Sequence, residues 1–285
     1  MKKSLLILFA AALTITSCSD KEDPIIKLNN QYLENVYGSP PQFELLDNPT
    51  KNVLVEEFTG HKCGFCPPAT ALLKQWAEEL GPRLVPIAIH AGTLASVGAE
   101  PFETDYNTDE GNFFWAQVEG GFNPSARVDR ITGAQNAYPY NDWMEMINAQ
   151  MDESPKVALQ GVAGFVSEDG IVNVHIHGQF LENLSDSYNL VVLLSESHII
   201  SAQEDYDQTP SEILDYEHNH VLRDGITIPE GLPVATAPSA NDVFVKSFSY
   251  EINPNWVWSN SHIVAYLIDV TTGDIVNALE LEIVE

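Results

Sequence analysis

Residues 53–80 read VLVEEFTGHKCGFCPPATALLKQWAEEL, and the architecture predicted for the chain starts from them. The apolar run at the beginning predicts a buried strand that ends near Phe58. After the two cysteines, apolar residues recur at the spacing of one helical face, and Gly81-Pro82 follows as a helix stop. The pair Cys63-x-x-Cys66 is therefore expected where a strand gives way to the N-terminus of a helix.

This position favours thiol chemistry. Backbone N–H groups and the dipole of a helix N-terminus stabilise a thiolate, and Lys62 adds a positive charge beside Cys63. An imidazolium at His61 would lower the pKa of that thiol further. In thiol–disulfide exchange the first cysteine attacks as a thiolate and the second resolves the mixed disulfide.

Two other interpretations of the cysteine pair stay open. The first is a permanently closed disulfide that only stabilises the fold. The second is a zinc site made of His61, Cys63, Cys66 and His90, which are ligands that zinc accepts. Zinc ligands usually come from two separate knuckles, and an exported protein favours a disulfide, so we predict no metal and no cofactor.

The composition describes a folded, acidic protein. Hydrophobic residues make up 44% of the 285 residues and aromatic residues 9%, which is typical of globular domains and leaves room for two of them. The 41 acidic and 13 basic residues give a net charge of −28. So negative a chain argues against nucleic acid or anionic lipid as a partner.

The N-terminus predicts export. Lys2-Lys3 and the apolar run after them are typical of a signal peptide, which we assign to residues 1–17. The apolar run is too short to span a bilayer stably. Ile15-Thr16-Ser17-Cys18 resembles a lipobox, in which cleavage precedes a cysteine that is then lipidated. An ordinary cleaved signal is the alternative.

Lipidation of Cys18 would leave Cys63 and Cys66 as the remaining pair in an oxidising compartment. Residues 18–50 are polar and contain four prolines. They predict a tether and a lead-in segment before the first domain.

Residues 51–154 predict a thioredoxin-like α/β domain. A second apolar run ends at His90, so strand, helix and strand form a βαβ unit with a parallel pair. Sites gather at the carboxyl ends of parallel strands, which brings His90 towards Cys63. Asn123-Pro124 precedes a predicted strand, where thioredoxin-like folds carry a cis-proline that faces the cysteines. Residues 140–151 predict the closing helix.

Residues 155–285 predict an all-β, immunoglobulin-like sandwich, because alternating segments dominate and no helical pattern appears. The predicted strands are 157–165, 171–180, 190–194, 243–252, 263–270 and 275–284. His218 and His220 share a strand face in this half, but no third metal ligand is evident.

The run Glu56–Pro68 resembles the Omp-twenty-eight family of bacterial outer-membrane lipoproteins. Ala88–Gly92, Gly121–Pro124 and Tyr216–Arg223 are further matches. The resemblance implies a thioredoxin-like domain followed by a β-sandwich, held in the outer membrane by a lipid anchor.

By extension from thioredoxin-like proteins, the resemblance implies Cys63 as nucleophile, Cys66 as resolving thiol and Pro124 as the cis-proline. Lys62 stands where thioredoxins have a tryptophan, and Phe65 stands where they have a proline. These departures concern the redox potential and the activity.

The sequence thus predicts a lipid-anchored envelope protein that exchanges thiols and disulfides with envelope proteins. Cys63, Cys66 and Pro124 would form the site, and His61, Lys62 and His90 would tune it. The alternative is a non-enzymatic, surface-exposed binding or adhesion lipoprotein with an unknown surface ligand, in which the disulfide is only structural. Whether the protein is an enzyme stays open at this point.

Overall fold

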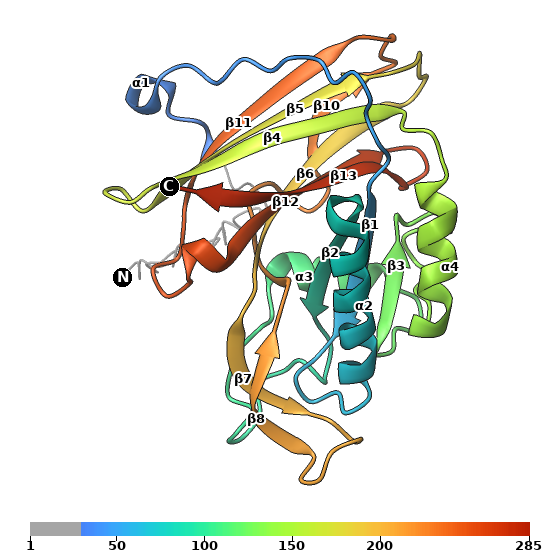
Figure 1. Ribbon diagram of the computed structural model, residues 1–285, viewed down its shortest axis with the longest axis vertical. Helices are drawn as coiled ribbons and strands as arrows, with labels where there is room; N and C mark the ends of the chain where they lie inside the picture. The colour runs from blue at the N-terminus through green and yellow to red at the C-terminus, as the bar shows by residue number, and fades with distance from the viewer. Residues whose placement is uncertain (1–29) are drawn as a thin grey trace, which may run out of the picture.

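The computed structural model describes residues 30–285 (Figure 1). The predicted signal peptide, the predicted lipidation site Cys18 and the start of the predicted tether lie outside the described residues. The remainder of that tether, up to residue 50, is mostly exposed and holds one short helix, α1 (Glu34–Tyr37).

Strands and helices alternate up to residue 151. They are β1 (Val53–Thr59), α2 (Cys66–Leu80), the 3-10 helix η2 (Gly81–Arg83), β2 (Leu84–His90), α3 (Asp109–Gln117), β3 (Ser125–Val128) and α4 (Tyr140–Met151). The bounds of α4 agree with the prediction. Helix α3 begins after Thr108, whose hydroxyl accepts a hydrogen bond from the backbone N–H of Gly111 as an N-cap.

Strands dominate the remainder of the chain. They are β4 (Val157–Val166), β5 (Ile171–Phe180), β6 (Ser187–Glu196), β7 (Ile199–Glu204), β8 (Glu212–His218), β9 (Val221–Gly225), β10 (Leu232–Thr236), β11 (Val243–Glu251), β12 (Ser261–Asp269) and β13 (Ile275–Val284), with the 3-10 helix η3 (Trp258–Asn260) before β12. All six predicted strands are present, with small shifts of their ends.

One sheet joins the two halves of the chain. Strand β1 pairs in parallel with β2, as predicted, and antiparallel with β3. Beyond β2 the sheet continues, because Ala88 pairs with Val221 of β9, and β9 pairs with β6. The result is an 11-stranded mixed sheet in the order β11-β5-β4-β13-β12-β6-β9-β2-β1-β3, with β10 beside β6.

Both faces of β1 and β2 are covered, and every residue of these strands is buried. On one face α2 and α4 contribute Leu73, Trp143 and Ile147 to a shared core with Val53 and Val55. On the other face the cover comes from α3 and from distant strands. Residues of β1 and β2 there share one core with members of β6, β12 and β13: Leu54, Phe58, Ile87, Val191, Val264, Tyr266 and Ala278.

The predicted fold class, a thioredoxin-like domain followed by an immunoglobulin-like sandwich, is therefore wrong. The chain is mostly β, with few helices and one large sheet that runs through both predicted parts. Alternation of apolar residues reports which face of a strand is buried, but it does not report which strand lies beside it. The boundary predicted near residue 154 stays a prediction.

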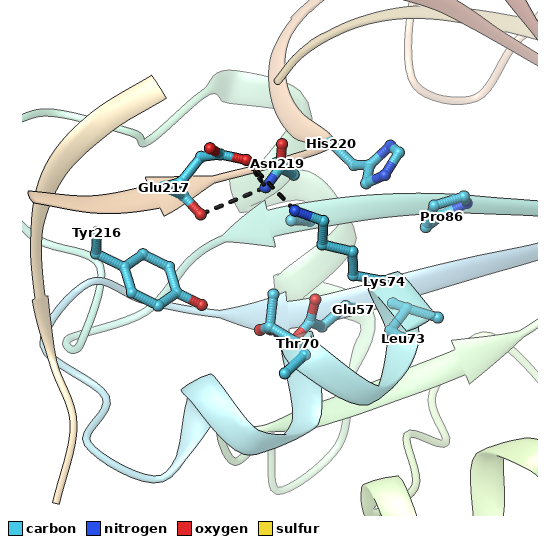
Figure 2. A pocket seen from close by; sticks show the side chains of 11 residues that line it. Glu57, Thr70, Leu73, Lys74, Pro86, Tyr216, Glu217, Asn219 and His220 are labelled. Atoms are coloured by element: carbon cyan, nitrogen blue, oxygen red, sulfur yellow. Dashed lines mark hydrogen bonds and ion pairs between the residues drawn. The ribbon is translucent and has the colours of Figure 1, made fainter. Parts of the chain in front are cut away.

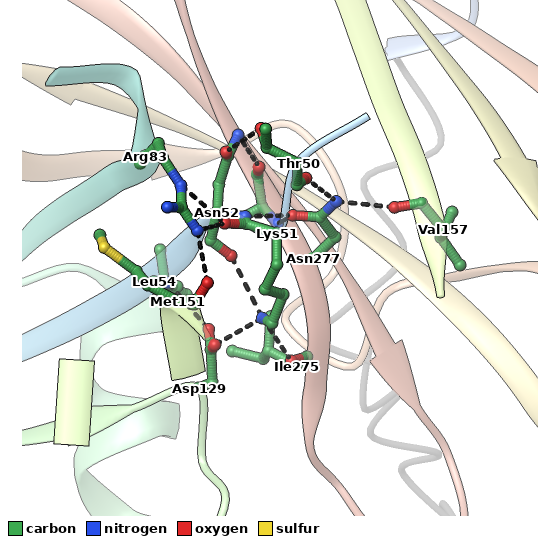
Figure 3. Close-up of polar contacts among 11 residues, drawn as sticks. Thr50, Lys51, Asn52, Leu54, Arg83, Asp129, Met151, Val157, Ile275 and Asn277 are labelled. Carbon is green, nitrogen blue, oxygen red and sulfur yellow. Dashed lines mark hydrogen bonds and ion pairs between the residues drawn. The ribbon is translucent and has the colours of Figure 1, made fainter. Parts of the chain in front are cut away.

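A polar junction ties the first strand to the β-rich half (Figure 3). The buried Lys51 ammonium lies 2.5 Å from the Asp129 carboxylate and also contacts the Ile275 carbonyl. The side chain of Asn277 accepts a hydrogen bond from the backbone of Asn52 and donates to the carbonyls of Thr50 and Val157. The buried side chain of Asn277 on β13 thus finds hydrogen-bond partners in the residues just before β1 and in Val157.

Candidate redox site

Cys63 and Cys66 form a disulfide at the junction of β1 and α2, with their Cα atoms 5.3 Å apart. The turn that carries them is closed by backbone hydrogen bonds from Cys63 to the Gly60 carbonyl (2.9 Å) and from Cys66 to the Cys63 carbonyl (3.0 Å). Helix α2 begins at Cys66 with prolines at its next two positions, where a missing N–H costs little. The sequence predicted this local structure correctly.

The segment before β3 reaches the same edge of the sheet. The Asn123–Pro124 peptide bond is cis, as predicted from its position. The Asn123 amide donates to the carbonyl of Thr59 (3.1 Å) at the end of β1 and to that of Ala91 (3.4 Å) beyond the end of β2. The turn with Pro124 is therefore fixed to the carboxyl ends of the two parallel strands.

His61 and His90 lie close together, and a third histidine joins them. The His90 ring lies 6.4 Å from His61 and 5.5 Å from His218 between centroids, and Tyr106 packs on all three rings. His218 comes from the end of β8. Sequence reasoning grouped His218 with His220 on one strand face and did not place it at this site.

The three histidines are buried, and burial sets their charge. It lowers the pKa of His218 to about 4 and the pKa of His90 well below its usual range. Burial, followed by the charge of Lys62, also lowers the pKa of His61. Neutral rings are therefore favoured at pH 7, which differs from the imidazolium expected at His61. The ammonium of Lys62 donates a hydrogen bond to the Ser96 hydroxyl (2.8 Å).

The zinc interpretation gains no support from this arrangement. Cys63 and Cys66 are joined to each other. Among residues 30–285, no group of three or more His, Cys, Asp or Glu side chains is arranged to hold a metal ion. The predicted roles of His61, Lys62 and His90 in tuning the cysteines stay predictions.

A hairpin from the β-rich half packs on the turn that carries the two cysteines. Strands β7 and β8 pair only with each other in the described part of the chain and form the β7–β8 arm, residues 199–218. Tyr206 at its tip packs against Gly64 and meets the Phe65 ring edge-on at 5.0 Å. Cys63 is 2% exposed and Cys66 1% exposed, so neither sulfur is open to a protein partner in this conformation. Nothing in the sequence indicates that this hairpin packs on the cysteine turn.

A pocket of about 210 Å³ lies beside α2, between the helix and the base of the arm (Figure 2). Glu57 of β1 lies in it, 1% exposed, and accepts a hydrogen bond from the Thr70 hydroxyl (2.5 Å). Tyr216 lines the pocket, and Lys74 contacts Glu217 at 3.4 Å beside it. Burial raises the pKa of Glu57 to about 7, against the hydrogen bond from Thr70 and the charge of His220.

Glu57 makes stability depend on pH. Its pKa is raised from 4.5 to about 7 in the folded chain, so its contribution is complete below 4.5 and is lost as the pH rises through 7. We therefore subtract the free energy of unfolding of wild type from that of Glu57→Gln at each pH. This difference should be about 3 kcal/mol more positive at pH 8 than at about pH 4. Urea unfolding at both pH values measures this shift. Glu78→Gln, at an exposed position of the neighbouring helix α2, is the matched control. An equal difference between Glu57→Gln and wild type at both pH values would contradict the raised pKa of Glu57.

These observations define a mostly β protein with one large mixed sheet, few helices and a disulfide at the N-terminus of one of them. The sequence matches the family described as "Outer membrane protein Omp28" over residues 116–283, which are 168 of 285 residues. The chain belongs to this family, as the resemblance of its motifs implied, and is thereby assigned to the outer membrane. No helix among residues 30–285 is long and apolar enough to cross a membrane.

The fold is similar to that of solved structures. HBP35 of Porphyromonas gingivalis is similar with a TM-score of 0.61 at 13% identity, covering 83% of this chain and 76% of its own. Protein AGR_C_4864 from Agrobacterium tumefaciens has a TM-score of 0.51 at 13% identity, covering 82% and 96%. A domain of the outer membrane lipoprotein Omp28 from Porphyromonas gingivalis matches 45% of this chain and 88% of its own at 19% identity, with a TM-score of 0.31. No curated protein matches the sequence. The first two structures show a likeness of fold alone at these identities, and nothing is drawn from the third.

Proposed function

We propose that the protein is a lipid-anchored protein of the outer membrane whose Cys63–Cys66 pair exchanges thiols and disulfides with envelope proteins. The observation that carries this proposal is the disulfide at the N-terminus of α2, where the helix dipole stabilises a thiolate. A purely structural disulfide has no need of that position.

The exchange proceeds in two balanced steps. The Cys63 thiolate of the reduced pair attacks a client disulfide, forms a mixed disulfide and releases one client thiolate. The Cys66 thiolate then attacks the Cys63 sulfur, closes the Cys63–Cys66 disulfide and releases the second client thiolate. Two electrons pass from the pair to the client, and the same steps in reverse oxidise a client dithiol.

A trapping experiment tests this function. In Cys66→Ser the mixed disulfide cannot be resolved, so we expect the full chain to accumulate covalent adducts with envelope proteins that dithiothreitol releases. Cys63→Ser is the matched control, because it removes the attacking sulfur. The wild type should reduce insulin disulfides and both single variants should not. Equal adduct levels in the two variants, together with an inactive wild type, would exclude the exchange function.

A second function has one observation in its favour. Both cysteines are almost completely buried, as expected of a disulfide that only stabilises a binding or adhesion protein. In that case a Cys63→Ala/Cys66→Ala double variant should keep its surface display and its binding of the unknown surface ligand. Loss of those properties in a variant that still folds would argue against the purely structural disulfide.

The anchor is part of the proposal. Cys18 follows the lipobox-like residues 15–17 and lies outside the described residues. Metabolic labelling with palmitate should mark the wild type and not Cys18→Ser. Labelling of the variant would exclude Cys18 as the lipid attachment site.

A further inference from the structure

The β7–β8 arm stands apart from the main sheet. In Figure 1 it extends past the lower end of α2, away from β4, β5 and β11. Its two strands pair from Ile199–His218 at the base to Glu204–Glu212 near the tip. Tyr206 at the tip remains 56% exposed although it packs on the cysteine turn. The arm therefore touches this turn at the margin of the molecule, not within a core.

The arm holds the cysteine turn through backbone hydrogen bonds. The N–H of Glu204 donates to the His61 carbonyl (2.8 Å), and the N–H of Tyr206 donates to the Gly64 carbonyl (2.9 Å). Alternate residues of the arm thus donate to the turn, as those of an added strand do. Such bonds do not depend on the arm's own sequence, so another extended polypeptide could make them.

Two side chains complete the contact. The amide of Gln203 donates to the carbonyls of Gly60 (3.3 Å) and Cys63 (3.1 Å). The Tyr206 ring packs against Gly64, where an added Cβ would come within 2.5 Å of it. Because Gly64 has no side chain, an aromatic ring can pack against the backbone at the residue that follows Cys63.

The attachment of the arm is uneven along its length. At its base, His218 is buried in the histidine cluster, and Ser201 shares a hydrogen bond of 2.6 Å with the Tyr106 hydroxyl. At the tip, by contrast, residues 206–210 are exposed, and Tyr206 keeps 56% of its surface open to solvent. Local opening draws on such weakly held segments. The tip can therefore leave the cysteine turn while the base stays packed.

We propose that residues 203–208 of the arm occupy the edge on which an extended segment of a client protein docks, with an aromatic client side chain in the place of Tyr206. The tip must leave before the disulfide or the reduced pair can react. The proposal rests on the exchange function proposed above. It adds the form of the client, an extended polypeptide, and a cover that keeps the cysteines from unselective reaction.

The rate of reduction by dithiothreitol tests the cover in the full chain. We expect Tyr206→Ala to raise the pseudo-first-order rate constant about tenfold, because the aromatic contact that holds the tip is lost. Tyr206→Phe keeps the ring, and Lys74→Met changes only the exposed pair, so both should stay within about twofold of wild type. Thermal unfolding checks that Tyr206→Ala remains folded. Equal reduction rates in Tyr206→Ala and wild type would contradict the proposal that the tip of the arm shields the disulfide.

A peptide tests the docking edge. Acetyl-Gln-Glu-Asp-Tyr-Asp-Gln-amide, the sequence of residues 203–208, should slow the reduction of Tyr206→Ala in a saturable way. The same peptide with alanine in place of tyrosine should not. If the tyrosine peptide has no saturable effect on the reduction rate, the proposed docking of an extended client segment at this edge is rejected.

The two proposals fail separately. Reduction of the disulfide by dithiothreitol requires no catalytic activity. If Tyr206→Ala is reduced faster than wild type but wild type does not reduce insulin, the covering role of the arm is supported and the exchange function is rejected. Exchange with unchanged dithiothreitol rates would keep the function and reject the cover.

Discussion

Glu56→Gln is expected to lower the free energy of unfolding by about 3–5 kcal/mol, because it removes the one negative charge between two buried arginines. The Glu56 carboxylate lies 2.9 Å from Arg127 and 2.5 Å from Arg130, and all three side chains are at most 4% exposed. Burial alone would raise the pKa of Glu56, but the two arginines hold it at about 2. The neutral amide would leave two guanidinium groups buried without a counter-charge.

Urea unfolding at pH 7 measures this loss. Glu251→Gln, at an exposed position on β11, is the control and should stay within about 0.5 kcal/mol of wild type. The contribution of Glu56 is present above pH 4.5 and is lost as the pH falls towards 2, so the gap between Glu56→Gln and wild type should narrow on acidification. If Glu56→Gln lowers the free energy of unfolding by less than about 1 kcal/mol at pH 7, the buried group of Glu56, Arg127 and Arg130 does not stabilise the fold as argued.

Lys51→Met is expected to cost a similar 3–5 kcal/mol at pH 8, because it leaves Asp129 buried without its cation. Asp129 is 0% exposed, and its other carboxylate oxygen accepts from the backbone N–H of Leu54 (2.8 Å). Burial already raises the pKa of Asp129 to about 6 even with Lys51 beside it. Without Lys51 that pKa rises further, and a raised carboxyl pKa removes stability as the pH rises.

The deficit of Lys51→Met should therefore be larger at pH 8 than at pH 5. Lys74→Met is the matched control, since Lys74 and Glu217 are 46% and 42% exposed. Loss of that exposed pair should cost no more than about 1 kcal/mol. An equally small effect of Lys51→Met would show that the polar junction does not hold the first strand to β13.

The local structure around the cysteines could be predicted because it depends on near neighbours. The apolar run 53–58, the helical spacing after Cys66 and the second run that ends at His90 give the βαβ unit directly. The helix 140–151 and the strands 171–180 and 275–284 have the predicted bounds for the same reason. The cis bond before Pro124 followed from its position ahead of β3.

The arrangement of the halves could not be predicted, because it depends on contacts between distant parts of the chain. Complete burial of β1 requires other residues to pack on both of its faces. Residues 53–59 do not indicate that Val264 and Tyr266 are among those residues. A single pairing of Ala88 with Val221 extends the sheet across the halves. The β7–β8 arm is equally hidden, since its alternation does not reveal that Tyr206 packs on Gly64.

The reduction potential of the Cys63–Cys66 couple tests the exchange function most directly. The full chain is equilibrated with dithiothreitol or glutathione buffers of defined potential, and the fraction of free thiols is measured by alkylation. We predict a potential clearly above about −300 mV, in the range of disulfides that exchange. A value below about −300 mV would contradict the account, because it would mark the bond as a structural disulfide that stays closed.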